Sequence, residues 1–510
     1  MRRTLAGSIL GCVVLAVGLF TTSLAASAAD GDLDNDWGTG GIAQADPLTA
    51  GLLGILDVRA NSVRIGADGK VIAVGFRNYD PGFSTPTVRM AVARFLPNGQ
   101  LDPTCDGDGV WLDPDLTSYN AGHDLEILPD GSFVVIGQQA NSSGLPEIFS
   151  FRFDAQCAPV SSYGSGGKVV YSIGAGAVPA ATVRQPDGKI VVVGWEMFTL
   201  ADDQDTRLLA FRIGADGQID TGFSPAGSGL YRDVDRPSQA RGVVRSPDGS
   251  LRIAGFTRPG AHDLGLVVAL DASGNLVPSF GNNGRRVVSQ ADELVYAGID
   301  RRADGRLVVS GRLTTGGSDQ LVIQCLLADG ASDTACGTNG ARTHSDFGSM
   351  EGRDIRVTGD GRLVVMGRIV DPVTTEFFHL VGRFTSDGVL DETFATAGYH
   401  VGTVIGQLMR IQLQSDGKIV GAGAHFPVTD SEFVVIRLDN TVITTTIAPS
   451  TTAPETIPST TAIPATNLMP TTTIAAERLP ATGHDQSGLV ALGLLISGVL
   501  LVATVRRRML

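Results

Sequence analysis

Short runs of apolar, mostly β-branched residues recur along the chain, and each run lies between a polar turn and a glycine. A typical run, Ile190–Val193, follows the turn Asp187-Gly188 and stops at Gly194. Runs of this length, rich in valine and isoleucine and bounded by turn residues, predict β-strands rather than helices. Asp-Gly suits a tight hairpin, because the turn needs positive φ at its centre, which glycine adopts freely.

The Asp-Gly hairpin repeats at a nearly constant spacing. Successive turn aspartates lie 62, 57, 61, 56, 56 and 56 residues apart. They are Asp68, Asp130, Asp187, Asp248, Asp304, Asp360 and Asp416. Seven copies at one period indicate a repeat protein in which each copy is one structural unit.

Each unit has a second half, made of a third strand, a glycine-containing connection and a short fourth strand. In the first unit these segments are Met90–Phe95, Asn98–Cys105 and Gly109–Leu112. Later copies of the connection lie at 216–223, 273–281 and 387–394. Four strands per unit and seven units predict an all-β, seven-bladed β-propeller over residues 30–440, with the blades arranged around a central channel.

The two ends of the repeat region are complementary. The last unit stops after a third strand at 433–440, and its missing half lies near the N-terminus at 31–43. A strand from that segment would complete the last blade and leave no open blade edge. The alternative is an open superhelical solenoid, but a solenoid does not need complementary half-units. The pattern favours a ring that is closed by its own N-terminal strand.

Residues 1–29 have the order of a secretory signal. Arg2 and Arg3 precede an apolar core at 9–20, and small residues at 26–29 predict cleavage after Ala28 or Ala29. The alternative is an uncleaved membrane anchor, but the apolar core is short for a membrane span. We therefore expect an exported protein.

Composition limits the partners of the exported chain. The 510 residues include 65 glycines and only 18% charged residues, which suits a β-protein with many turns. Cleavage of the leader and of the C-terminal signal described below would remove five arginines and one aspartate, so the formal charge of the chain would fall from −14 to −18. Such an acidic protein is a poor partner for nucleic acid. We expect a monomer.

Residues 441–478 change abruptly to threonine and proline. A segment of this composition cannot bury a core, so it predicts an extended stalk that is open to glycosylation. At the polyproline rise of about 3.1 Å per residue, the stalk could reach roughly 110 Å.

At this point the chain resembles a known family. Asp-Gly-Lys-Ile, followed by Arg-hydrophobic-x-x-Asp-Gly-x-Leu-Asp-x-x-Phe-Gly, is similar to the delta-60 repeat of exported bacterial β-propellers, and the resemblance covers residues 30–440. It implies a propeller but no single activity. The chain departs from the pattern where Cys105 and Cys336 replace the aromatic residue, and where Val160–Tyr163 replaces most of the second connection.

Comparison of the units predicts ion pairs between the third strand and the connection. The strand position holds Arg94, Arg152, Arg212, Arg383 and Arg437, and the connection position holds Asp102, Asp220, Asp391 and, after ring closure, Asp34. The fourth unit lacks both residues, having Ala269 and Val277, whereas the second unit breaks the rule with Arg152 and Val160. We expect bridges Arg94–Asp102, Arg212–Asp220, Arg383–Asp391 and Arg437–Asp34.

Four cysteines remain after removal of the leader, which contains Cys12. An even number in an exported chain favours disulfides, and four cysteines allow three pairings. In the fifth unit, Cys325 occupies the arginine position and Cys336 the aromatic position. A Cys325–Cys336 disulfide would replace the lost contacts, and Cys105–Cys157 would then link the connections of neighbouring blades. Free buried thiols are the alternative.

One segment, near the C-terminus, has a defined chemistry. Leu479-Pro480-Ala481-Thr482-Gly483 precedes a polar spacer, an apolar run at 489–505 and the basic residues 506–508. In this order, residues 479–510 resemble the sorting signal of sortase substrates in Gram-positive bacteria. The apolar run is expected to lodge as a helix in the membrane, held by the arginines on the cytoplasmic side.

The resemblance to a sorting signal implies that a sortase thiol attacks the carbonyl of Thr482. The bond between Thr482 and Gly483 would break, and Thr482 would pass to an amine of peptidoglycan. A plain transmembrane anchor is the alternative. The sequence therefore predicts covalent attachment to the cell wall of a Gram-positive bacterium.

No motif for catalysis or for a cofactor stands out in the sequence. The seven histidines are scattered, and there is no nucleophile elbow and no phosphate loop. Spaced carboxylates at 30–36 and 106–108 resemble calcium ligands, but the first set lacks the glycine and distal glutamate of a full calcium loop. We expect no cofactor and no metal, with calcium as an alternative.

The sequence thus predicts a secreted, wall-attached protein that displays a propeller for extracellular binding or adhesion, with a glycan or a protein as ligand. One alternative is a wall-tethered hydrolase or lyase that acts on glycans in the central channel. Another is a calcium-stabilised structural spacer. Close carboxylates or histidines at the channel mouth would favour the enzyme, and a face of loops without such a cluster would favour binding.

Overall fold

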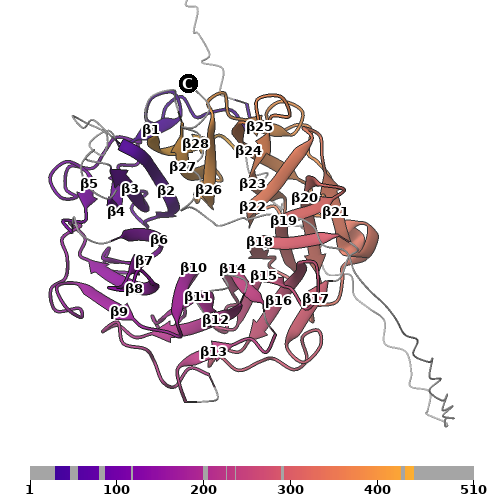
Figure 1. The fold of residues 1–510 in the computed structure, drawn as a ribbon. Coiled ribbons are helices and arrows are strands. Elements are labelled where there is room, and N and C mark those ends of the chain that lie inside the picture. Colours follow the sequence, from indigo (N-terminus) through magenta and orange to yellow (C-terminus); the bar gives the residue numbers. More distant parts are fainter. Residues whose placement is uncertain are drawn as a thin grey trace, which may run out of the picture. The chain divides into compact units, whose positions relative to one another are not determined.

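The computed structural model describes residues 29–45, 55–79, 87–115, 119–198, 205–224, 227–235, 237–288, 292–426 and 431–440. These residues form seven four-stranded sheets around a central channel, and Figure 1 looks along that channel. The predicted seven-bladed propeller is confirmed. Residues 1–28, the stalk at 441–478 and the sorting signal with its C-terminal helix lie outside the described residues.

The strands of each blade follow one another from the channel outward. The inner strands are β2 (Ile55–Ile65), β6 (Asn120–Ile127), β10 (Gly176–Arg184), β14 (Ser238–Arg245), β18 (Glu293–Arg301), β22 (Ser349–Val357) and β26 (Gly406–Leu413). The second strands are β3 (Val71–Tyr79), β7 (Phe133–Ala140), β11 (Ile190–Met197), β15 (Leu251–Thr257), β19 (Leu307–Thr315), β23 (Leu363–Val370) and β27 (Ile419–His425).

The outer half of each blade completes the sheet. The third strands are β4 (Thr87–Phe95), β8 (Pro146–Phe153), β12 (Thr206–Ile213), β16 (Leu264–Leu270), β20 (Ser318–Leu326), β24 (Phe377–Phe384) and β28 (Glu432–Leu438). The outermost strands are β5 (Val110–Leu112), β9 (Lys168–Tyr171), β13 (Leu230–Arg232), β17 (Arg285–Val288), β21 (Ala341–His344), β25 (Tyr399–Val401) and β1 (Ile42–Gln44). Two short 3₁₀ helices, η2 (Thr334–Cys336) and η3 (Thr338–Gly340), lie in the connection of the fifth blade. Among the residues that the structure describes, no helix is long and apolar enough to cross a membrane.

The N-terminal strand closes the ring. Strand β1 pairs antiparallel with β28, so that Ile42 faces Ile436 and Ala43 faces Val435. The N–H of Gly31 donates to the carbonyl of Asp439 at 2.6 Å. The last blade therefore consists of β26, β27, β28 and β1, as the complementary half-units predicted, and the open solenoid is excluded.

Apolar side chains fill the space between neighbouring blades. The described residues form seven apolar clusters, and each draws on two consecutive blades. One cluster, for example, joins Val134 of β7 to Val192 of β11, and another joins Val63 of β2 to Val420 of β27 across the closure. Both faces of a blade are thus covered, which is why the second and third strands read as continuous apolar runs rather than alternating ones.

In four blades, an ion pair ties the third strand to the connection of the same blade. Arg94 Nε lies 2.8 Å from Asp102 Oδ2, and Arg212 Nη2 lies 2.8 Å from Asp220 Oδ2. The last two blades have Arg383–Asp391 at 2.7 Å and Arg437–Asp34 at 2.6 Å. The same arginines reach the next blade, since Arg212 donates to Ala272 O at 2.8 Å and Arg437 to Pro97 O at 3.2 Å.

A second cation, which the sequence comparison missed, binds the same aspartates. Lys70, two residues after Asp68 in the hairpin turn, lies 2.9 Å from Asp102. In the fifth blade, Arg306 lies 3.0 Å from Asp333, which takes the connection position. Lysine or arginine follows the turn in the five units that have this aspartate, at positions 70, 189, 306, 362 and 418, and serine follows it in the two units that have valine instead. Turn and connection are therefore coupled by charge in five blades.

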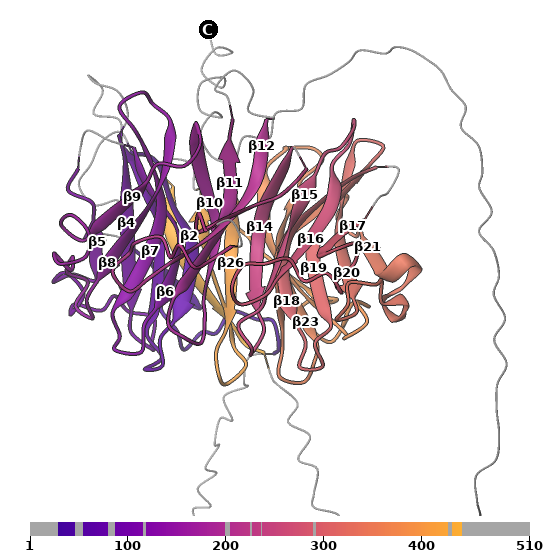
Figure 2. The same cartoon turned by 90° about the horizontal axis from the view of Figure 1, so that it is seen from below.

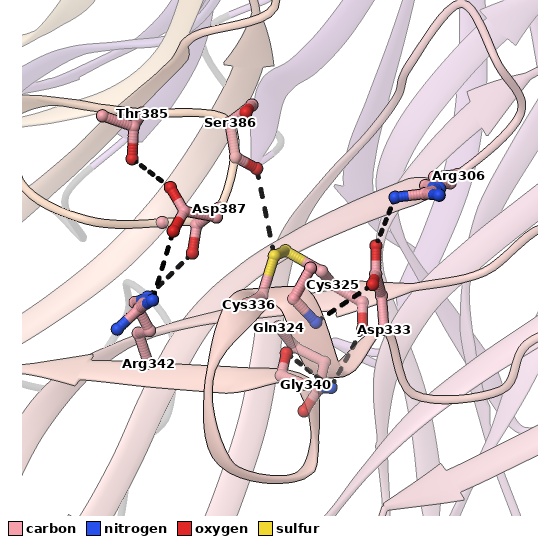
Figure 3. The surroundings of a disulfide bond; sticks show 12 residues. Arg306, Gln324, Cys325, Asp333, Cys336, Gly340, Arg342, Thr385, Ser386 and Asp387 are labelled. Carbon is pink, nitrogen blue, oxygen red and sulfur yellow. Dashed lines mark hydrogen bonds and ion pairs between the residues drawn. A yellow bond between two sulfur atoms is a disulfide. The ribbon is translucent and has the colours of Figure 1, made fainter.

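Two disulfides lie on the outer side of the blades. Cys105 joins Cys157 with an S–S distance of 2.04 Å, linking the connection of the first blade to a turn of the second. Cys325 joins Cys336 with an S–S distance of 1.92 Å and ties β20 to η2 within the fifth blade. Figure 3 shows this second bond beside the Arg306–Asp333 pair, with Cys336 next to Ser386 of the sixth blade.

The two disulfides close loops of different length, which predicts different effects on stability. The half-cystines are 52 residues apart in Cys105–Cys157 and 11 residues apart in Cys325–Cys336. The longer loop restricts the unfolded chain more, so its removal is expected to cost about 1.4 kcal/mol more in the free energy of unfolding. Paired Cys→Ser variants of each disulfide, unfolded in denaturant, measure the difference. Equal losses, or the reverse order, would contradict the prediction.

Candidate functional site

Where it lines the channel, every inner strand has a β-bulge, at which one residue has no partner on the second strand. In β2, Ala60 pairs with Gly75 and Ser62 with Val74, so Asn61 is left over as a β-bulge. The equivalent residues are His123, Ala180, Arg241, Ala297, Arg353 and Met409. Each of the seven lies seven residues before its turn aspartate. The seven bulges therefore lie at one level of the channel. Each bulge changes the direction of the side chains near it.

The bulge explains the glycine that stops each apolar run in the sequence. Gly194 does not end its strand, because β11 continues to Met197. It pairs with Pro179 beside the bulge, and a Cβ on Gly194 would lie 2.1 Å from the carbonyl oxygen of Val178. At Gly75 the corresponding distance to Arg59 O is 1.8 Å. The glycine is therefore needed for close approach of two backbones inside the strand pair.

Charged side chains meet in the channel beside the bulges. Arg64 of β2 lies 3.0 Å from Asp124 and 3.4 Å from Glu126, both of β6. On another side of the ring, Arg356 lies 2.6 Å from Asp354. These carboxylates also bind the backbone of the next blade, since Thr182 N donates to Asp124 at 2.8 Å and Ile411 N to Asp354 at 3.0 Å. The channel carboxylates thus connect neighbouring inner strands.

Arg410 crosses the channel. Its guanidinium donates to Ala180 O of the third blade at 3.0 Å and to Arg241 O of the fourth blade at 3.1 Å. The cavity at this level is lined by residues of all seven inner strands and measures about 30 Å³. Clefts that bind small molecules usually measure about 300–1,000 Å³. The middle of the channel is therefore too small for a sugar.

Three titratable groups on β6 have perturbed pKa values. Burial raises the pKa of Glu126, only partly opposed by Arg64, and the nearby Asp124 adds to the shift. For Asp124, burial is outweighed by Arg64 and Arg410, so its pKa is lowered. Burial lowers the pKa of His123 to about 4. Close carboxylates with separated pKa values are what a glycan-cleaving enzyme would need, but here they are held by arginines in a space without room for substrate.

A second group of charges lies at the mouth of the channel. Seen from the side, the strands run between two faces of the ring (Figure 2), and we call the face at which the inner strands begin the start face. Here Arg353 and Arg368 pair with Glu351, Arg312 lies close enough to lower the pKa of Glu351, and Arg241 lies near Arg312 and Arg353. These five residues are called the arginine cluster. Glu351 lies 2.6 Å from Arg353 and 2.7 Å from Arg368. Burial would raise the pKa of Glu351, but Arg353 and Arg368 outweigh it and hold the pKa at about 2.

Aromatic rings hold one arginine of the cluster. The guanidinium carbon of Arg241 lies 4.9 Å from the ring centroid of Trp195 and 5.6 Å from that of Phe256. Burial lowers the pKa of Arg241 to about 10, with Asp263 opposing the shift and the neighbouring arginines adding to it. The mouth of the channel is therefore a positively charged, partly aromatic surface.

A cleft of about 450 Å³ opens between the fifth and sixth blades. Its lining combines hydroxyl, amide and carboxylate groups with the apolar side chains of Val370 and Pro372; the polar residues are Ser318, Gln320, Ser345, Ser349, Asp371 and Thr375. Ser349 belongs to β22, the strand that also carries Glu351 and Arg353, so the cleft and the arginine cluster share an element. Together they form the candidate binding site.

The sequence-predicted residues lie elsewhere. The arginines named in the sequence comparison lie on the third strands, and the aspartates lie in the connections that these strands contact. Together with the two disulfides they stabilise the outer half of the blades. Two of the carboxylates considered as calcium ligands are in ion pairs, since Asp30 lies 2.6 Å from Arg383 and Asp34 lies 2.5 Å from Lys418. Across the described ranges, no group of three or more histidine, cysteine, aspartate or glutamate residues is arranged to hold a metal ion.

Sequence reasoning missed the arginine cluster, although a signal for it exists. Arg241 and Arg353 lie seven residues before their turn aspartates, whereas Arg312 and Arg368 lie eight residues after theirs. Trp195 and Phe256 share that second offset. Positions counted from the turn would therefore have shown which residues surround the channel mouth.

Comparison with known proteins supports the fold. A family model described as "Domain of unknown function (DUF5122) beta-propeller" matches residues 66–104, 185–223 and 302–335. No curated protein matches the chain. Among solved structures, polysaccharide lyase Uly1 is 11% identical with a TM-score of 0.44, covering 74% of this chain and 90% of that chain.

Two further structures are similar at the same level. The β-propeller domain of the Trilobed protease from Pyrococcus furiosus is 10% identical with a TM-score of 0.40, covering 75% of this chain and 92% of that one. Drosophila Semaphorin 2a is 8% identical with a TM-score of 0.42, covering 76% and 75%. At these identities and TM-scores, no activity of these proteins extends to this chain. The chain is thus a seven-bladed β-propeller whose first, third and fifth units match a propeller family of unknown function.

Proposed function

We propose that this protein is exported, attached covalently to the cell wall through Thr482, and displays its propeller as a rigid binding platform. The observation that carries attachment is the order of Leu479–Gly483, the apolar run at 489–505 and the basic residues 506–508. The stalk at 441–478 would hold the propeller away from the wall. The predicted signal cleavage after Ala28 or Ala29 would make Ala29 or Asp30 the first residue of the mature protein.

The geometry of the channel favours binding over catalysis. A hydrolase or lyase needs carboxylates that a substrate can reach, but Asp124 is 2% exposed and faces a cavity of about 30 Å³. The start face, by contrast, offers a cleft of about 450 Å³, within the usual size of ligand sites. The start face is therefore the proposed binding surface.

Display as single copies fits the lysines of the chain. A pilus subunit needs an accessible lysine as the nucleophile that links one subunit to the next. Lys70, Lys189 and Lys418 lie 2.9, 2.6 and 2.5 Å from connection aspartates. Lys168 donates to Asn120 at 2.8 Å and lies over the ring of Phe149. Each of the four lysines therefore already has a polar partner within the propeller.

Wall attachment is tested by Thr482→Ala. Because the sorting reaction would form its new bond at the carbonyl of this residue, we expect the protein to disappear from the wall fraction and to remain with the membrane or the medium. The measurement is cell fractionation after digestion of the wall, followed by immunoblotting. Thr473→Ala, in the stalk, is the matched control and should stay wall-linked. Equal wall linkage of the Thr482→Ala protein would refute attachment through Thr482.

A further inference from the structure

We propose that the start face binds an acidic polysaccharide. Its carboxylate or sulfate groups would bind the arginine cluster, and its sugar rings would occupy the cleft between the fifth and sixth blades, with their hydroxyls on the polar side chains that line it. This inference rests on the proposed binding function and names the class of ligand.

The charge of the arginine cluster is opposite to that of the protein as a whole. The five residues of the cluster contain four guanidinium groups and one carboxylate, which gives a formal charge of +3 within a mature chain whose formal charge is −18. At the edge of the cluster, Arg312 lies 3.7 Å from Asp319. Concentrating positive charge at one mouth in this way favours an anionic ligand there.

The guanidinium groups are held in place before any ligand arrives. Arg241 lies against two aromatic rings and donates to Gln239 Oε1 at 2.8 Å. Arg353 donates to Gln407 Oε1 at 2.9 Å, and Arg368 lies 4.3 Å from the ring centroid of Phe377. Fixed, planar guanidinium groups bind carboxylate or sulfate with two parallel hydrogen bonds and lose little entropy in doing so.

Three guanidinium groups of the arginine cluster remain within reach of solvent. The side chains of Arg312, Arg353 and Arg368 are 17%, 19% and 14% exposed. Their aliphatic stems are therefore covered, and their polar edges can meet a ligand at the mouth.

The cleft explains why the ligand is a saccharide. Its hydroxyl and amide groups, from Ser318, Gln320, Ser345 and Thr375, are donors and acceptors that suit sugar hydroxyls. The carboxylate of Asp371 accepts backbone N–H bonds from Val373 and Thr374 at 2.8 Å each, which uses that charge within its own turn. Inorganic phosphate would not fill a cleft of this size, and an acidic polysaccharide satisfies both the cleft and the arginines.

The test uses the full-length protein produced in a Gram-positive host, on cells or recovered from the medium. The probes are fluorescent polygalacturonate, dextran sulfate and neutral dextran of the same length. We expect the two anionic polymers to bind and neutral dextran not to bind. Arg312→Gln and Arg241→Gln should each weaken anionic binding roughly tenfold or more, because a hydrogen bond to a charged group is lost. Binding should also weaken as salt is raised.

Arg342→Gln is the matched control, because Arg342 pairs with Asp387 on the outer side of the blades, at 3.2 Å. Thermal melting of each variant shows that it is folded. The inference is overturned if neutral dextran binds equally, if Arg342→Gln causes the same loss, or if polyglutamate binds as tightly as polygalacturonate.

A glycan and matrix-protein array separates this inference from the proposed function. A ligand whose binding is unchanged by the two arginine variants would refute the acidic saccharide and leave the display function standing. Absence of any ligand on the array and among the polymers would refute both.

Discussion

Replacing Arg383 by alanine is expected to lower the free energy of unfolding by about 3–5 kcal/mol, because it breaks a buried ion pair by removing one partner. The Arg383 side chain is 1% exposed, with Nε 2.7 Å from Asp391 and Nη1 2.6 Å from Asp30. It also donates to Asn440 at 2.8 Å. The arginine therefore joins the sixth blade to both ends of the described ring, and its loss leaves two carboxylates with reduced compensation.

Arg152→Ala is the matched control at the same position of the repeat. The Arg152 side chain is 25% exposed and lies 3.9 Å from Asp130, which is 64% exposed. An exposed pair of this kind contributes about 0–1 kcal/mol. Chemical denaturation of both variants measures the difference. If the two proteins unfold at the same denaturant concentration, burial of the ion pair does not determine its contribution.

Lowering the pH below 6.5 is expected to destabilise the protein through a stack of histidines in the last two blades. The ring centroid of His379 on β24 lies 5.7 Å from that of His400 on β25 and 5.6 Å from that of His425 on β27. His379 is 4% exposed, and neither ring nitrogen has a hydrogen-bond partner among the described residues. Burial, with the two neighbouring histidines, lowers its pKa to about 3.

The direction of the effect follows from the two pKa values of His379. In the unfolded chain the pKa is about 6.5, so between pH 6.5 and pH 3 the unfolded state binds the additional proton. Stability is therefore fully present above pH 6.5 and is lost as the pH falls toward 3, by up to about 1.4 kcal/mol per pH unit from this residue. Burial also lowers the pKa of His400 and of His425, which adds to the loss. Asp32 opposes the shift of His400, and Glu432 lies 4.0 Å from His425.

Melting temperatures measured from pH 7.5 to pH 4.5 test the histidine stack. His379→Phe keeps an aromatic ring of similar size and removes the titration, so the melting temperature should depend less on pH. His262→Gln, at an exposed loop position, is the control and should leave the dependence unchanged. Asp102, whose pKa is held at about 2, titrates below this window. Burial raises the pKa of other carboxylates, among them Glu126 and Asp300, but their contribution is the same in both proteins and cancels in the comparison with His379→Phe. An unchanged pH dependence in His379→Phe would contradict the assignment.

The ion pairs of the blades could be inferred only in part from the sequence. Comparison of the units placed Arg94 and Asp102 in one bridge, because both vary together at fixed positions, and the structure joins them at 2.8 Å. The comparison did not connect Lys70 with Asp102, although lysine or arginine follows the turn wherever the aspartate is present. In such a unit the turn and the connection are about 30 residues apart along the chain, with the second and third strands between them. They come close to each other only in the folded blade.

The glycines show the same limit at the level of one strand. The pattern indicated that Gly194 ends the apolar run, whereas β11 passes through it to Met197. The reason lies in another strand, where the bulge in β10 brings the carbonyl of Val178 to within 2.1 Å of a Cβ on Gly194. The sequence pattern along one strand gives no information about the backbone of the neighbouring strand that approaches it.

The sequence by itself determined the number of blades and the way the ring closes. Both depend on local hairpins that recur seven times, and each copy carries its own turn, its own apolar run and its own connection. The tertiary structure alone decided the chemistry of the channel and of the start face. The residues there differ from unit to unit and gain their partners only when the inner strands converge. Arg410, for example, donates to the carbonyl groups of Ala180 and Arg241, which are 230 and 169 residues away along the chain. A repeated pattern allows the fold to be predicted along the chain, whereas a site that combines residues of several blades can be recognised only in the folded ring.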